Sequence, residues 1–246
     1  MTGDLTSRWQ LETVRATVFA RDIAGLDLPN WQSFIGPGRE QVNNPSPGTT
    51  VEIGPYMGGT LTIGIAGRAG RADLILRMPP TTLPLSHRAN NFSGAILEKL
   101  GGIAKKWLSV NSNIARLALF ATVWQGERTL DDALKTILAK IPSFGKGENE
   151  KIIDFFLQIN RPRNSDVDGG IIINRLAQWS ARMVEILALP GSIWAMTGPK
   201  MIPRAQIDID INTVERNAPI SNDRIHAHLD EMAHWLVEIV EHGDRP

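Results

Sequence analysis

The sequence predicts an α+β fold in which antiparallel sheets pack against helices. Three observations support this prediction. Isoleucines alternate with polar residues from Gln206 to Asn212, as expected of a strand with one buried face. The stretch from Ser221 to His242 has an apolar stripe at helical spacing. Between residues 50 and 78, three short strand-like runs are separated by glycine-rich turns, which is typical of β hairpins.

The first half of the chain begins with a strand over Leu11–Arg21, followed by a mixed segment that can hold a short helix near Trp31 and Phe34. The stretch from Asn43 to Gly48 is rich in Asn, Pro and Gly and is interpreted as a loop. The expected elements that follow are strands at Thr50–Tyr56, Thr60–Ala66 and Arg71–Met78 and a helix at Phe92–Val110, whose middle is weakened by Gly101 and Gly102.

The second half begins with a strand over Asn113–Gln125 that is apolar on both faces. Thr129, with Asp132 three residues later, predicts the capped start of a short helix. A strand, Ile152–Asn160, leads to a polar hairpin tip at Arg161–Gly170 and a return strand from Ile171. The segment Arg175–Leu189 fits helix or strand, and we favour a strand that continues from Ile171. The strand near Gln206 and the final helix complete the chain.

This order of elements is the same in residues 1–112 and 113–246, and it suggests two βαβββα units packed as one compact body. Sequence identity between the halves is negligible, so the interpretation rests on order alone. A tandem duplication and a coincidence within an ordinary α+β chain both explain it.

The composition indicates a globular protein: of 246 residues, 42% are hydrophobic and 21% charged. The absence of cysteine excludes disulfides, thiolate metal sites and thiol nucleophiles. No apolar run approaches the roughly 20 residues that span a bilayer, and the polar N-terminus lacks the pattern of a secretory signal. We therefore expect a cytoplasmic protein without a membrane partner. Because 26 basic and 26 acidic residues cancel, net charge does not indicate nucleic acid as a partner, although it does not forbid one.

The strand over Ala205–Val214, the gap after it and the helix over Arg224–Glu241 resemble the C-terminal signature of a sporadically distributed family of uncharacterised prokaryotic proteins. The helix and core strand within Asn91–Trp124 are placed similarly. The central strand lacks the tyrosine and asparagine that this family carries. The family has no established activity, so the resemblance implies no site residue. Its sporadic distribution suggests a setting in antiviral defence, for which no residue argues directly.

Two groups of residues could carry chemistry. Asp208 and Asp210 share one face of a strand, and such carboxylate pairs can hold Mg²⁺ or Mn²⁺ with further ligands. Solvated polar side chains on an outer sheet face are the simpler interpretation, and we expect no metal or other cofactor. The last helix carries four histidines, but the zinc-protease spacing is missing and the drift along the helix prevents them from meeting at one point.

The candidate binding residues are an aromatic side chain and a basic cluster, with no catalytic residue among them. Trp235 lies beside the apolar stripe of the last helix, where an exposed tryptophan would anchor an interface. Arg161 and Arg163 lie at the polar hairpin tip, with Arg175 further along, and could contact an acidic partner or a phosphate backbone. Solubilising charge is the alternative.

Three functions remain open. The preferred one is a non-catalytic binding protein, an adaptor or accessory subunit of a larger prokaryotic assembly, whose partner is another protein or a second copy of the chain. It predicts an apolar patch near Trp235 or along a sheet edge. A metal-dependent phosphodiesterase or nuclease using Asp208 and Asp210 is the second. A small-ligand binder, with a cavity of a few hundred Å³ between the sheet and the last helix, is the third.

Overall fold

The computed structural model describes residues 9–21, 31–46, 49–66, 70–79, 92, 94–109, 111, 113–141, 154–186, 200–215 and 218–243. Its elements in the first half are β1 (Gln10–Ala20), α1 (Trp31–Phe34), β2 (Gln41–Ser46), β3 (Thr49–Tyr56), β4 (Gly59–Ala66), β5 (Arg71–Arg77) and α2 (Gly94–Ser109). Those in the second half are β6 (Ile114–Gly126), α3 (Leu130–Leu138), β7 (Phe155–Asn160), β8 (Arg163–Asn164), β9 (Ile172–Ile186), β10 (Lys200–Thr213) and α4 (Asn222–His242).

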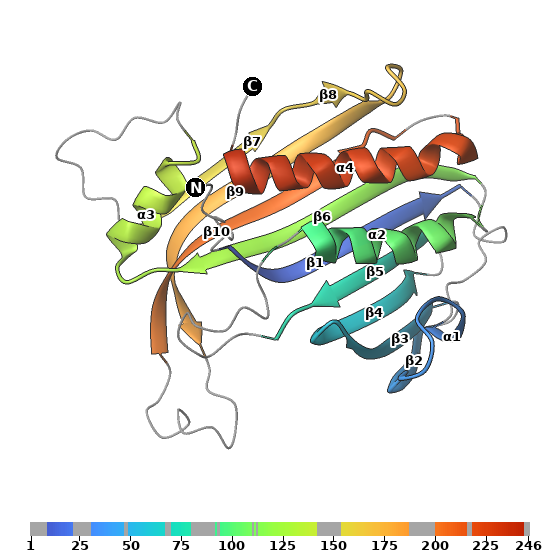
Figure 1. The fold of residues 1–246 in the computed structure, drawn as a ribbon, viewed down its shortest axis with the longest axis horizontal. Helices are drawn as coiled ribbons and strands as arrows, with labels where there is room; N and C mark the ends of the chain where they lie inside the picture. The colour runs from blue at the N-terminus through green and yellow to red at the C-terminus, as the bar shows by residue number, and fades with distance from the viewer. Residues whose placement is uncertain are drawn as a thin grey trace, which may run out of the picture.

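The strands form one antiparallel ten-stranded sheet, which confirms the predicted α+β class (Figure 1). The strand order is β2-β3-β4-β5-β1-β6-β10-β9-β7, and β8 pairs with β9. The central pair β1–β6 joins strands from both sides of the predicted boundary at residue 112, so the sheet runs through both halves. The two halves place their strands in a similar way around β1 and β6, but order alone does not show a duplication, which stays a prediction.

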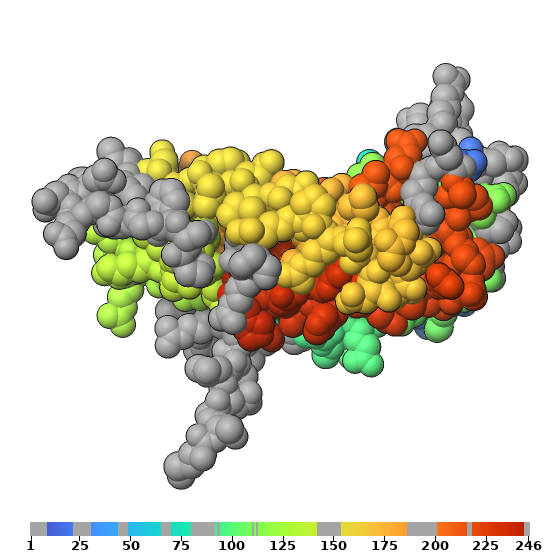
Figure 2. All heavy atoms as spheres, turned by 90° about the horizontal axis from the view of Figure 1, so that it is seen from above, coloured from blue at the N-terminus to red at the C-terminus, as the bar shows by residue number. Residues whose placement is uncertain are grey.

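The described helices pack on one face of the sheet. Figure 2 views the molecule from the β7 edge, with α2, α3 and α4 below the strands. The alternation along β10 explains this layer: Ile207, Ile209 and Ile211 have 0% exposure under the helices, while the polar residues between them lie on the opposite face. We call that opposite face, which no described helix covers, the open face. None of the described helices is long and apolar enough to span a membrane.

Most predicted elements are confirmed within a few residues. The ambiguous segment after Ile171 is a strand, since β9 runs to Ile186. Thr129 caps α3 by accepting a hydrogen bond from the backbone N–H of Asp132. One prediction is wrong: β2 extends through Asn43 to Ser46, in a stretch interpreted as a loop. Proline has no backbone N–H to donate. Because β2 is the edge strand, Pro45 is tolerated there without the loss of a hydrogen bond that the sheet needs.

Candidate functional site

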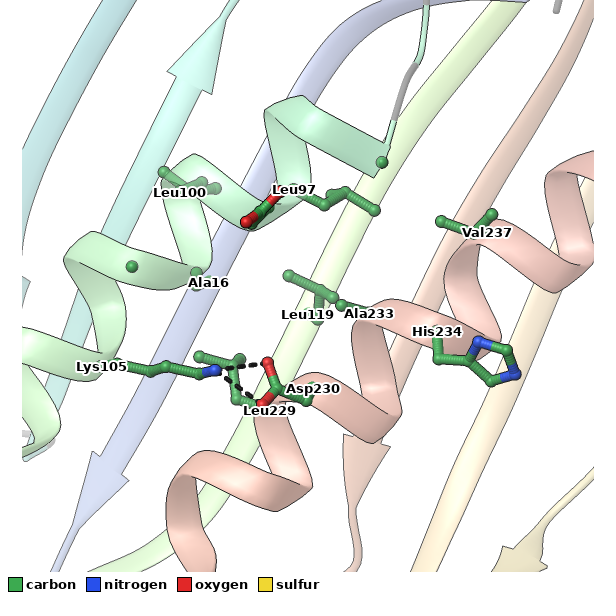
Figure 3. A pocket seen from close by; sticks show the side chains of 14 residues that line it. Ala16, Leu97, Leu100, Lys105, Leu119, Leu229, Asp230, Ala233, His234 and Val237 are labelled. Carbon is green, nitrogen blue, oxygen red and sulfur yellow. Dashed lines mark hydrogen bonds and ion pairs between the residues drawn. The ribbon is translucent and has the colours of Figure 1, made fainter.

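A groove of about 500 Å³ lies between α2 and α4 (Figure 3). The two helices run antiparallel, and they touch where the second half of α2 meets the first half of α4. Lys105 forms an ion pair with Asp230, with its Nζ 2.5 Å from Oδ1, and Ser109 Oγ lies 3.3 Å from Nε2 of His226. The groove opens beyond this contact, and Lys105–Asp230 closes one end of it.

Small residues create the groove. Gly101 and Gly102 of α2 line the groove together with Ala233 and His234 of α4. A Cβ added at either glycine would meet no heavy atom within 4 Å, so the missing side chains leave open space. The remaining lining residues give an apolar floor and a polar rim: Ala16, Leu97, Leu100, Leu119, Leu229 and Val237 below, and Glu98, Lys105, Asp230 and His234 above, with Gly94 at the far end.

Gly101→Ala and Gly102→Ala should each stabilise the unliganded protein by about 0.5–1 kcal/mol, because alanine in a helix interior lowers the entropy lost on folding. Space exists for both methyl groups. Urea denaturation measures the change in the free energy of unfolding. A loss of stability in either variant would mean that this wall of the groove is packed more tightly than the structure shows.

The predicted binding residues lie close together, with Trp235 and Arg175 buried and Arg161 and Arg163 half-buried. Trp235 is only 4% exposed and belongs to the core, so the prediction that it is an exposed interface anchor is wrong. The Arg175 guanidinium from β9 lies over its ring, 5.6 Å from the centroid. Glu238 of α4 then pairs with both Arg175, at 3.4 Å, and Arg163, at 3.5 Å. Arg161 holds the start of the tip by donating its backbone N–H to the carbonyl of Arg175.

The hairpin tip at Arg161–Gly170 therefore packs on α4 instead of protruding. A second contact, which the sequence did not reveal, fixes it there. Ser165, 3% exposed, donates to Glu231 Oε2 at 2.6 Å, and its Oγ lies 3.1 Å from Nδ1 of the fully buried His228. The backbone N–H groups of Val167 and Asp168 donate to the same Oγ. The serine, histidine and carboxylate resemble a catalytic set in composition only, because burial keeps a substrate away from the hydroxyl.

Asp208 and Asp210 lie on the open face and are held by neutral donors. Asp208 accepts hydrogen bonds from Thr122 at 2.7 Å and Gln206 at 2.6 Å, and Asp210 accepts one from Asn212 at 3.0 Å. Within the described residues, no group of three His, Asp or Glu side chains could hold a metal ion. The histidines of α4 diverge as expected: His226 faces α2, His228 is buried, and His234 lies at the groove rim.

No protein-family model matches this chain, and the comparisons with curated proteins and with solved structures found no match. The family resemblance of its C-terminal strand and helix therefore stays a prediction. The geometry of the groove and of the open face is what supports a proposal about function.

Proposed function

We propose that this protein is a non-catalytic binding protein that holds a small amphipathic molecule in the groove between α2 and α4. The groove itself carries the proposal, because 500 Å³ falls in the range of about 300–1,000 Å³ that is usual for small-molecule sites. The ligand-binding hypothesis expected a cavity between the sheet and the last helix, whereas this groove lies between α2 and α4.

The lining indicates the chemistry of the ligand. Leu97, Leu100 and Leu119 offer an apolar surface to the body of the molecule (Figure 3). Lys105, Asp230 and His234 line the polar rim and can orient a group that both donates and accepts hydrogen bonds. The Lys105–Asp230 pair is exposed enough to exchange partners at small cost, since such surface pairs contribute roughly 0–1 kcal/mol.

Filling the groove tests this function. Ala233→Trp should place an indole in the groove and abolish retention of a ligand, whereas His242→Trp, on the same helix but outside the groove lining, should retain it. Native mass spectrometry of protein purified from its source detects a retained compound. Thermal shifts with that compound then measure its binding to each of the two variants. A compound that Ala233→Trp binds as well as the unchanged protein does would place the site elsewhere.

An adaptor or accessory subunit in the cytoplasm is the second candidate, and one observation favours it. Phe156 is 63% exposed on β7, which lies at the edge of the sheet and could pair with a strand of another protein or of a second copy. The adaptor hypothesis also expected an exposed Trp235 as an anchor for the partner, but Trp235 is buried. An affinity pull-down that returns a stoichiometric protein partner, lost in Phe156→Ser, would favour this function over ligand binding.

A further inference from the structure

The open face of the sheet carries a repeated pairing of arginine with phenylalanine at its centre. On β1, Arg15 and Phe19 point to this face, and on β6 Arg116 and Phe120 do the same. Because the strands are antiparallel, Arg15 lies opposite Phe120 and Phe19 opposite Arg116. The guanidinium carbons lie 5.1 Å and 5.2 Å from the opposing ring centroids.

Two further stacks extend this arrangement on either side. Arg71 from β5 lies over Phe19, with its guanidinium carbon 5.8 Å from the ring centroid. On the other side, Arg204 of β10 lies 4.8 Å over Trp124. Burial lowers the pKa of Arg204, and its hydrogen bond with Glu12 partly offsets this effect. The open face therefore presents four guanidinium groups supported by aromatic rings, from β5 across to β10.

Three aspartates on this face, Asp73, Asp208 and Asp210, interact with groups other than Arg15 and Arg116. Asp73 pairs with Arg71 and accepts a hydrogen bond from Thr17, while Asp208 and Asp210 are held by amides and a hydroxyl. Arg116 donates to the Asn212 amide oxygen at 2.9 Å. Within the described part of the chain, neither Arg15 nor Arg116 forms an ion pair with a carboxylate. The positive charge of both half-buried arginines is therefore not offset by a direct carboxylate contact among the described residues.

We propose that the open face binds single-stranded nucleic acid. A guanidinium fixed over a ring can donate to phosphate oxygens from its edge, while its plane and the neighbouring rings accept an unstacked base. The half-buried amide of Gln178 lies on the same face and can bond a base edge, whereas the hydroxyls of Thr17 and Thr122 are buried and donate to Asp73 and Asp208. A broad sheet cannot enter a duplex groove as a helix or two-stranded ribbon does, so single strands are preferred over duplex. The neutral net charge of the chain does not oppose this local arrangement.

Fluorescence anisotropy with a labelled mixed-sequence oligonucleotide of about 12 nucleotides, single-stranded and annealed, tests this proposal. The single strand should bind more tightly than the duplex. Arg15→Gln/Arg116→Gln should weaken binding by about tenfold or more and reduce the salt slope of log K by roughly 1–2 between about 50 and 200 mM salt. The matched control, Lys99→Gln/Lys106→Gln, removes two exposed charges from α2 on the other side of the sheet and should change affinity less than about twofold.

Two further variants separate a binding role from a folding role. Arg182 is exposed on the same face, donates to Gln206 and can be replaced by glutamine with little effect on folding. Arg182→Gln should lower affinity by several-fold, and Phe19→Leu/Phe120→Leu should do so through lost stacking while the salt slope stays unchanged. Equal losses in the α2 control, no detectable binding at about 50 mM salt, or binding of acidic peptides but not oligonucleotides would each overturn the proposal.

Discussion

Replacing Arg175 with alanine is expected to destabilise the protein by about 2–3 kcal/mol. Its side chain is only 3% exposed, pairs with Glu238 and covers the ring of Trp235. The substitution removes this packing, leaves a cavity against the tryptophan and takes one of two cationic partners from Glu238. Urea unfolding monitored by tryptophan fluorescence measures the effect.

Arg163→Ala provides the matched comparison, because both arginines reach the same Oε2 of Glu238. The Arg163 side chain is 33% exposed, so water screens its pair, and we expect a loss below about 1 kcal/mol. Equal losses in the two variants would show that burial does not distinguish these contacts. A full-stability Arg175→Ala variant with a partner-binding defect would instead restore the predicted binding role of Arg175.

Ser165→Ala should cost about 1–3 kcal/mol and loosen the hairpin tip from α4. The hydroxyl is nearly fully buried and contacts Glu231, His228 and two backbone N–H groups. Removing the hydroxyl leaves buried polar groups without this hydrogen-bond partner. They must then stay unpaired or bond to water that enters the site. Amide hydrogen exchange should accelerate at Val167 and Asp168, whose N–H groups donate to this oxygen.

Ser109→Ala is the control for this loss. Its hydroxyl is exposed, donates to the Lys105 carbonyl within α2 and lies 3.3 Å from His226 Nε2 of α4. Because water can replace these exposed contacts, we expect a change within about 0.5 kcal/mol. If Ser165→Ala were as mild, the contact between the tip and α4 would depend on Arg163, Arg175 and Glu238 and not on the serine.

The strands and helices were largely predictable because their signals are local. Alternation in β10 and the Thr129 cap of α3 depend on residues only a few positions apart, and both are confirmed. The edge strand β2 was missed because its Asn and Pro residues are typical of loops, and only its position beside β3 makes a strand acceptable there. The sequence does contain one overlooked signal: Arg-x-x-x-Phe-Ala occurs at both Arg15 and Arg116.

The candidate sites were not predictable in the same way. Gly101 and Gly102 were read as a weakness of the helix, yet they form a groove wall because α4 passes beside them. Trp235 was expected at the surface and is buried, and Arg175 of β9 lies over its ring.

By itself, the sequence determined the α+β class and the burial pattern of most strands, because hydrophobic periodicity is a property of neighbouring residues. The tertiary structure alone decided which helices lie side by side, that Arg15 stacks on Phe120, and that Ser165 meets His228. These contacts join residues far apart in the chain, and their pairing follows from strand order and helix packing, which periodicity does not encode.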